Sequence, residues 1–356
     1  MNKILATSLS QTGFCYQSKP QNINMSDETY PIKWNPLPES ILEDLKRDFA
    51  PGSLVFECLE SNGVWMNKNI LVDGPKIYNF PLRPDDVWIV TYPKCGTTWT
   101  QELLWLIMHN ADFEGAKSYV YDRSPFIEFA TLTTHDRKDK QMASKKTEED
   151  KKKGEWTICN TIGYAENFQS PRLIKSHLPL FMLPPKLLDT CKVIYVCRNP
   201  KDCCVSYYHH SLLMENNYLK NGFGEFAKRF MKGHIEYGSY WTHLKDAWAR
   251  KNHPNLKFLW YETMKKDLKP VIKELTSFLD YKVTEDQVLQ IDGFLEFSTY
   301  QKFRSEHPVK SEVAKKFFRK GKVGDWANYF TEEELKAWQE WIENNSSQLE
   351  GLTFIE

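Results

Sequence analysis

From about residue 80 onward, short apolar runs alternate with stretches in which apolar positions recur at helical spacing. Residues 87–90 read Val-Trp-Ile-Val, which predicts a short buried strand that ends before Pro93. A helix is predicted to begin at Thr97, because the apolar positions that follow it lie on one helical face, at Trp99, Leu103, Leu106 and Ile107. Two further strands are predicted at residues 191–196 and 256–261, followed by helical runs from Cys203 and Glu262.

Strands that alternate with helices indicate βαβ units, so we expect an α/β fold whose central parallel sheet is flanked by helices on both faces. The alternation pauses over residues 111–169, which include a dense run of opposite charges at residues 145–153. This run predicts a solvated helix within an inserted segment. Residues 1–35 are expected to be a flexible N-terminal extension, with Met25 as an alternative start, and residues 36–356 a single domain.

Composition disfavours several classes of protein. The chain of 356 residues has 47 basic and 47 acidic side chains, and a formal net charge of zero disfavours a general nucleic-acid binder. Its eight cysteines show no paired zinc spacing, which predicts buried thiols in a reducing compartment. No apolar stretch approaches the ~20 residues of a membrane span. We therefore expect a cytoplasmic protein without nucleic-acid or membrane partners, in which any anion site is built from short basic motifs.

The first such motif follows the strand at residues 87–90, where Lys94-Cys95-Gly96-Thr97-Thr98 leads into the helix. Gly96 lets the backbone approach a ligand closely, and the N–H groups of the first helical turn carry the positive end of the helix dipole. With a lysine and two hydroxyls added, the loop predicts a P-loop-kinase-like phosphate site, although similar turns also occur without a ligand. It is not a Walker A motif, because Lys94 precedes the glycine.

Two more basic clusters suit the same kind of ligand. Arg198 directly follows a predicted strand, and Ser206 lies on the helical run beyond it. Near the C-terminus, residues 319–324 place three cations around two glycines, which predicts a second phosphate site. Either cluster alone would more often be solvated surface. Together, two phosphate sites indicate a nucleotide that is phosphorylated at both ends.

These motifs resemble those of the cytosolic sulfotransferases and occur in the same order. Residues 91–99 resemble the loop that holds the 5′-phosphosulfate of 3′-phosphoadenosine 5′-phosphosulfate (PAPS), residues 198–209 the 3′-phosphate strand and helix, and residues 319–326 the C-terminal signature. The resemblance extends from about residue 81 to the C-terminus, and residues 111–169 are most similar to insect members related to retinol dehydratase. It implies PAPS as the co-substrate, the desulfated nucleotide PAP as a product, and no metal requirement.

Carried over by position, the resemblance implies three groups of residues that bind the nucleotide. The group at the 5′-phosphate comprises Lys94, Cys95, Gly96, Thr97 and Thr98, with Cys95 where serine is usual. The group at the adenine comprises Trp99 and Tyr261, and Ser298 and Tyr300 are further cofactor-binding positions in a loosely aligned segment. The group at the 3′-phosphate comprises Arg198, Ser206, Arg319, Lys320 and Gly321, with Phe318 as a further cofactor-binding position.

The segment Lys175-Ser176-His177-Leu178-Pro179 is similar to the family's Lys-Thr-His-Leu-Pro, which implies that His177 is the general base. Without the resemblance, a lone histidine after a strand would more often be structural. The chemistry also calls for Lys94 to stabilise charge on the departing phosphate, with help from Lys175. The resemblance implies that Ser206 holds Lys94 away from the donor until the acceptor arrives.

The acceptor pocket of the family is apolar, and the aligned positions here are Phe126, Phe129, His210 and Tyr240, with Trp241 a further candidate. Phenylalanines at such spacing are about as often core residues. An apolar lining favours phenols, sterols or retinoid-like alcohols as acceptors. The family's dimer motif is altered, because Ala327 stands where a lysine is usual and Glu332 follows Thr331. Whether the protein forms a homodimer therefore stays open.

Three other functions stay open at this point. A nucleotide-dependent kinase would need a Walker lysine and metal-holding acids, and neither is found. A non-catalytic carrier of apolar ligands would need no base, yet His177 and the basic clusters are all present. Elimination of sulfate could follow the transfer step, as in the dehydratase.

Overall fold

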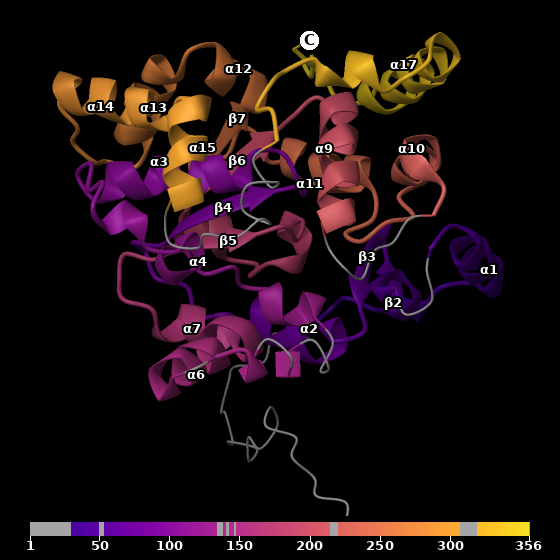
Figure 1. Cartoon of the computed structure of the whole chain (residues 1–356), viewed down its shortest axis with the longest axis horizontal. Coiled ribbons are helices and arrows are strands. Elements are labelled where there is room, and N and C mark those ends of the chain that lie inside the picture. Colours follow the sequence, from indigo (N-terminus) through magenta and orange to yellow (C-terminus); the bar gives the residue numbers. More distant parts are fainter. Residues whose placement is uncertain are drawn as a thin grey trace, which may run out of the picture.

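The computed structural model describes residues 30–49, 53–133, 138–139, 142–145, 147–213, 220–306 and 319–355. At its centre is a four-stranded sheet in the order β5 (Leu173–Ser176), β4 (Val87–Thr91), β6 (Lys192–Cys197), β7 (Leu256–Trp260). All neighbouring strands in it run parallel. Helices surround this sheet (Figure 1). The predicted α/β fold with a central parallel sheet is therefore confirmed.

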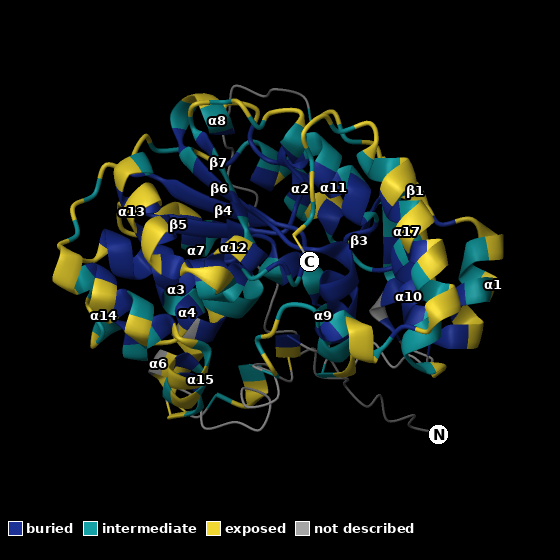
Figure 2. Ribbon diagram, turned by 90° about the horizontal axis from the view of Figure 1, so that it is seen from above, coloured by how far each residue is buried: buried dark blue, intermediate teal, exposed yellow. Residues whose placement is uncertain are grey.

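The strands bury alternate side chains in two separate cores, one on each face of the sheet. In β4, Val87 and Ile89 belong to one core, and Trp88 and Val90 belong to the other. The first core is completed by α3 (Thr97–Met108), α13 (Leu268–Phe278) and α14 (Glu285–Leu295). The second is completed by α2 (Ile70–Tyr78), α9 (Pro200–Leu213), α10 (Gly222–Lys232), α11 (Tyr240–Trp248) and α17 (Glu332–Ser346). Because both faces are covered, the central strands are mostly buried (Figure 2) and read as continuous apolar runs.

The predicted boundaries agree with the structure to within a few residues. The largest difference is at α9, which begins at Pro200 and not at Cys203. Proline is well accommodated in the first helical turn, because an N–H there has no helical partner. Asn199 stabilises this turn, since its Oδ1 accepts the Lys201 N–H at 3.0 Å. The helix α12 (Tyr261–Lys266) likewise begins one residue before the predicted Glu262.

A small antiparallel sheet precedes the central one, and the apolar pattern did not predict it. Its order is β1 (Asn35–Pro36), β2 (Cys58–Ser61), β3 (Val64–Asn67). None of these strands is longer than four residues, and all four positions of β3 are buried. Such short runs show neither alternation nor length, which are the signals that mark a strand. Residues 1–29 lie outside the described residues, so the flexible extension stays a prediction.

The described part of residues 111–169 is helical. It contains η2 (Gly115–Lys117), α4 (Val120–Arg123), η3 (Phe129–Leu132), α6 (Glu148–Gly154), η4 (Glu155–Cys159) and α7 (Thr161–Asn167). The charged run falls in α6, where Glu148 and Lys151 form an ion pair with side chains 81% and 46% exposed. Thr147 caps this helix by accepting the Asp150 N–H at 3.0 Å. The predicted solvated helix is confirmed, whereas its origin as an insertion stays a prediction.

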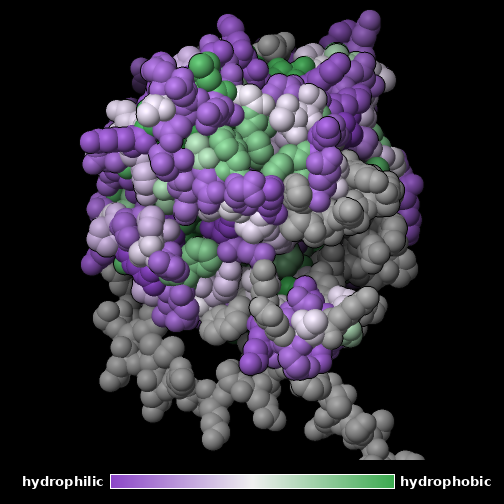
Figure 3. Space-filling view, turned by 60° about the vertical axis from the view of Figure 1, so that its left-hand side comes forward, coloured by the Kyte–Doolittle hydropathy of each residue, from purple (hydrophilic) through white to green (hydrophobic). Residues whose placement is uncertain are grey.

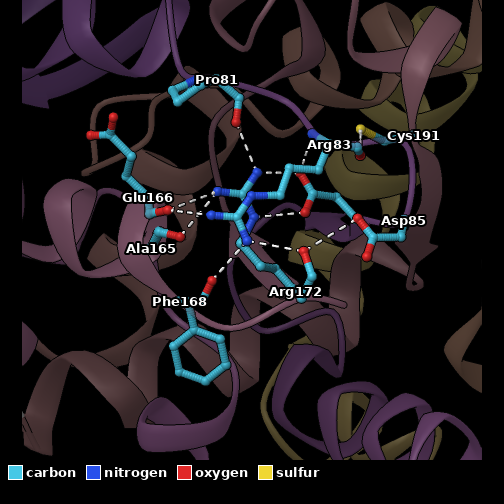
Figure 4. Close-up of polar contacts among 10 residues, drawn as sticks. Pro81, Arg83, Asp85, Ala165, Glu166, Phe168, Arg172 and Cys191 are labelled. Carbon is cyan, nitrogen blue, oxygen red and sulfur yellow. Dashed lines mark hydrogen bonds and ion pairs between the residues drawn. The ribbon is translucent and has the colours of Figure 1, made fainter.

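Two arginines attach α7 to the amino ends of the central strands (Figure 4). Arg172, which precedes β5, forms a fully buried ion pair with Asp86, which precedes β4, at 2.5 Å. Arg172 also donates to the carbonyls of Pro81 and Ala165 at 2.8 and 3.2 Å. Arg83 donates to the Glu166 carbonyl at 2.7 Å. The last carbonyls of α7, which have no partner within the helix, are thereby satisfied by positive charge.

The remaining elements are short or lie at the periphery of the sheet. They are α1 (Glu39–Asp48), η1 (Leu54–Glu57), η5 (Leu180–Met182), α8 (Leu187–Thr190), α15 (Phe297–Glu306) and η6 (Asp325–Asn328). Hydrophilic side chains cover much of the face in Figure 3, with hydrophobic groups gathered near its middle. Among the described residues, no helix combines the length and apolar character needed to cross a bilayer.

Candidate active site

The site lies where the connections of the central sheet change direction. From β4 the chain continues to β5 on one side, whereas from β6 it continues to β7 on the other. Ligands of open α/β sheets bind beyond the carboxyl ends of two such strands, because their loops diverge there. The two loops at this point carry Lys94 and Arg198, and Arg198 Nη1 donates to the Lys94 carbonyl at 3.1 Å. The sheet therefore brings the first two predicted basic motifs together.

The loop after β4 has the backbone shape that a close ligand approach requires. Lys94 and Gly96 both have positive φ, at 69° and 101°. A Cβ on Gly96 would lie 2.6 Å from Tyr261 Cδ2, so glycine is required both for conformation and for space. Gly96 precedes the first turn of α3, where Thr97 and Thr98 begin the helix. The N–H groups of this turn are suited to an anion.

Side chains in the loop take different directions. Thr97 Oγ1 lies 2.7 Å from Thr91 Oγ1, and the Cys95 thiol is buried 3.8 Å from the thiol of Cys203. Cys95 therefore faces the core and offers a ligand its backbone alone. All cysteines within the described residues are free thiols.

Positive charge is concentrated around this loop. The pKa of Lys94 is lowered to about 7, chiefly by burial and then by the charges of Lys175 and Arg198. The pKa of Lys175 is also lowered to about 7 by burial, although Glu128 opposes this shift. Burial disfavours the charged form of a lysine, and like charges add to that effect. A bound anion would relieve both effects, so the electrostatics favour a phosphate or sulfate here.

His177 follows β5 directly, and its imidazole is fixed beside this cluster. Its Nδ1 lies 2.9 Å from the Thr91 carbonyl, which can only accept, so Nδ1 carries the proton and donates. The lone pair is therefore at Nε2, as a general base requires. The pKa of His177 lies well below its usual range, because of burial and then Lys175, so the ring is neutral at physiological pH.

Aromatic rings surround the base. Phe126 meets the His177 ring edge-on at 5.3 Å, and Phe129 lies 5.8 Å from Phe126. Of the four predicted pocket residues, Phe126 thus contacts the His177 ring, and Phe129 contacts Phe126. Burial lowers the pKa of His210 well below its usual range, and the charges of Lys94 and Lys175 add to this effect. Tyr240 instead is 1% exposed, and its hydroxyl donates to the Arg198 carbonyl at 2.7 Å, behind the basic loop.

The third predicted basic motif borders a cavity of about 430 Å³, whose lining includes Phe297, Arg319, Lys320, Lys322, Asp325 and Asn328. Asp325 pairs with Arg319 at 2.6 Å and with Lys320 at 2.8 Å. The carboxylate of Asp202 on α9 accepts the Gly324 and Trp326 N–H groups at 2.7 and 3.1 Å. These bonds hold the motif against the helix that follows Arg198 and carries the half-buried Ser206.

The remaining predicted cofactor-binding residues are only partly brought together. The rings of Trp99 and Tyr261 meet edge-on at 5.7 Å, and Tyr261 lies under the Arg198 guanidinium at 4.3 Å. Tyr300 is 1% exposed within the core, whereas Ser298 is exposed to solvent. Phe318 lies outside the described residues.

Phe297 is a site residue that the sequence reasoning missed. It lines the cavity beside Arg319, and a Cβ on Gly321, whose φ is 60°, would lie 2.0 Å from its ring. The sequence signal that could have identified Phe297 was its position next to Ser298, in the loosely aligned segment. Two more missed residues, Glu128 and Tyr237, contact His177. Thr91, the first residue of the loop motif at residues 91–99, also contacts His177, which the motif did not predict.

Comparison with known proteins identifies the family. A model described as "Sulfotransferase domain" matches residues 84–351, which is most of the chain. The chain belongs to the sulfotransferase family. Luciferin sulfotransferase of Photinus pyralis is 32% identical over 331 residues, which cover 89% of this chain and 86% of that protein. Human sulfotransferase 1E1 is 32% identical over 283 residues, which cover 76% and 87%.

Solved structures agree with this assignment. Retinol dehydratase in complex with androsterone and the inactive cofactor PAP has a TM-score of 0.79 and 29% identity, with 91% of this chain and 98% of that one covered. Mouse sulfotransferase SULT7A1 complexed with PAP has a TM-score of 0.63 and 25% identity, with coverage of 81% and 94%. The chain is therefore a transferase enzyme with the sulfotransferase fold. Within the described residues, no group of three or more histidine, cysteine or acidic side chains could hold a metal ion.

Proposed function

We propose that this sulfotransferase transfers the sulfuryl group of PAPS to the hydroxyl of a small apolar or phenolic acceptor, with His177 as the general base and PAP as the product. The observation that carries the proposal is the neutral His177 ring, with Nδ1–H held by the Thr91 carbonyl, beside the Lys94 loop. That PAP is bound in the structures of two similar proteins supports the choice of donor.

The transfer balances in a single displacement. His177 Nε2 takes the proton of the acceptor hydroxyl as its oxygen bonds to sulfur. The bond between sulfur and the bridging oxygen breaks, and its electron pair stays on the 5′-phosphate of PAP. Lys94 in its protonated form stabilises the charge on that oxygen, with Lys175 beside it. Ser206 is proposed to hold Lys94 until the acceptor is bound.

The 3′-phosphate is proposed to bind between Arg198 and the C-terminal motif. Asp325 fixes Arg319 and Lys320 through separate carboxylate oxygens, so that their other donors remain available to a phosphate. The adenine would lie among Trp99, Tyr261 and Phe297. Tyr261 contacts Arg198, and Phe297 lines the same cavity as Arg319. No step of this scheme calls on a metal ion.

Phe126 beside His177, with Phe129 packed against Phe126, supports an acceptor with an apolar or aromatic body and one reactive hydroxyl. The similarity to retinol dehydratase keeps one alternative, in which sulfate is eliminated after transfer. We further propose that the enzyme works in the cytoplasm, which suits the free thiols of its described cysteines.

The test is a transfer assay with PAPS and a panel of phenols, sterols, retinoids and sugars, with the product mass recorded. We expect a gain of one sulfuryl group on an apolar acceptor, whereas loss of water from the acceptor would indicate elimination. His177→Ala should lower kcat by about 10²–10⁴-fold, the usual contribution of a general base, with PAP affinity kept within two-fold. Retained turnover in His177→Ala would remove it as the base.

A further inference from the structure

Two buried side chains hold the backbone of His177 from opposite sides. Glu128 Oε1 accepts the His177 N–H at 2.5 Å, and His243 Nε2 lies 3.1 Å from the His177 carbonyl. A carbonyl can only accept, so His243 donates at Nε2 and accepts at Nδ1 from the Tyr195 hydroxyl, 2.8 Å away. With the ring held by Thr91 as well, the imidazole has little freedom to move.

Glu128 reaches His177 because its segment pairs with β5 as an additional short strand. Phe126 pairs with Lys175 in a parallel bridge, in which the Ile127 N–H donates to the Lys175 carbonyl at 3.1 Å. The Lys175 N–H donates to the Pro125 carbonyl at 2.9 Å. Two residues further along each segment, the Glu128 side chain meets the His177 N–H. Glu128 is fully buried, so this is a fixed contact and not a surface one.

Tyr237 fixes the same carboxylate from the other side. Its hydroxyl donates to Glu128 Oε1 at 3.2 Å, and its ring meets the His177 ring edge-on at 5.5 Å. Its φ is 67°, which is a strained conformation for a bulky residue. The strain is held by a bond from the Tyr237 N–H to the Trp65 carbonyl at 2.7 Å. Residues with strained backbone conformations are found often at active sites, where the strain allows a side chain to take an orientation that a relaxed backbone would not give.

We infer that Glu128, locked by Tyr237, is the positioning residue of His177, and that its carboxyl oxygen sets where His177 Nε2 meets the acceptor hydroxyl. The inference rests on the proposed function, since it needs His177 as the base. Glu128 acts through the length of its side chain, which brings an acceptor oxygen to the His177 N–H. Its charge has a smaller part, because burial raises the pKa of Glu128 to about 7 and leaves the carboxyl partly neutral near physiological pH.

Two substitutions separate length from charge. Glu128→Gln keeps the length and the acceptor oxygen but removes the charge, and kcat should stay within about three-fold of the wild type. Glu128→Asp keeps the charge but shortens the side chain by one methylene, and kcat should fall by about ten- to a hundred-fold, as misplacement by ~1 Å can cause. Affinity for PAP should stay within two-fold in both variants. The reverse order of the two kcat values would overturn the inference.

Matched controls come from Asp246 on α11, whose Oδ2 accepts the backbone N–H of Phe181 at a distance of 3.0 Å. Asp246→Asn and Asp246→Glu should change melting temperature without the kcat pattern of the Glu128 pair. Tyr237→Phe is an independent arm that remains informative where a Glu128 variant does not fold. It should lower kcat by about three-fold or more at unchanged PAP affinity, and an unchanged kcat contradicts the inference.

His177→Ala is assayed in parallel, because it separates the two proposals. Turnover in His177→Ala overturns the base assignment and the positioning role together. Loss of turnover there, with full turnover in Glu128→Asp, overturns the positioning role alone.

Discussion

At the amino ends of β4 and β5, the buried cation Arg172 is matched by Asp86 in an ion pair that is 0% exposed on both sides. At the carboxyl ends of the same sheet, the charge of Lys175 lowers the pKa of Lys94, and the charges of both lysines lower the pKa of His177. Burial lowers the pKa of both lysines to about 7. The first arrangement serves the fold, whereas the second is suited to bind an anion.

This difference predicts which residues can be changed without loss of stability. Removing one member of a buried ion pair leaves the other charge without compensation, which is strongly destabilising. Removing a cation from a cluster of like charges relieves repulsion instead. The two ends of the sheet should therefore respond to substitution in opposite ways.

The largest effect is expected at the amino ends. Asp86→Ala leaves the Arg172 guanidinium buried without its carboxylate, so the free energy of unfolding should fall by about 3–5 kcal/mol. Urea denaturation followed by circular dichroism measures it. The exposed pair of Lys257 and Glu274 is the control, and Glu274→Ala should cost about 1 kcal/mol or less. Equal losses of unfolding free energy in Asp86→Ala and Glu274→Ala would show that the buried ion pair stabilises the fold no more than an exposed one.

The next largest effect is expected at the carboxyl ends, on turnover and not on stability. Lys94→Met should lower kcat by about 10²–10³-fold, the size seen when a donor to developing charge is lost. Its free energy of unfolding should stay equal to or above that of the wild type, because a desolvated cation has been removed from beside Lys175 and Arg198. Marked destabilisation in this variant would show that Lys94 stabilises the fold as Arg172 does.

The smallest effect is a shift in protonation on binding. The pKa of Lys94 is about 7 without ligand, and an adjacent anion raises the pKa of a lysine. Above pH 7 the enzyme should therefore take up a proton when it binds PAP, and its affinity should fall as pH rises. Calorimetry in buffers of different ionisation enthalpy measures the uptake. Lys94→Met should take up fewer protons than the wild type, and an equal uptake would assign the effect to Lys175.

Much of the fold and most of the proposed donor site could be predicted because their signals are contiguous in the chain. The strand at residues 87–90, the glycine loop and the helix from Thr97 follow one another directly and occur as predicted. Parallel strands place their carboxyl ends along one edge, so Lys94, His177 and Arg198 could be expected to converge once the βαβ pattern was recognised. The small sheet of β1, β2 and β3 was missed because strands this short carry almost no pattern.

The sequence by itself determined the order of the central strands and helices and the basic loops, and it singled out His177 as the proposed base, since each of these signals lies in neighbouring residues. Tertiary structure alone decided what surrounds them. Glu128 and Tyr237 lie 49 and 60 residues from His177 in the chain, and no spacing rule links them. The hydrogen bond from Tyr240 to the Arg198 carbonyl, and the cavity that Phe297 shares with Arg319, likewise depend on how helices pack. Local physics specifies strands and turns, whereas contacts between distant segments depend on packing that no single stretch of sequence contains.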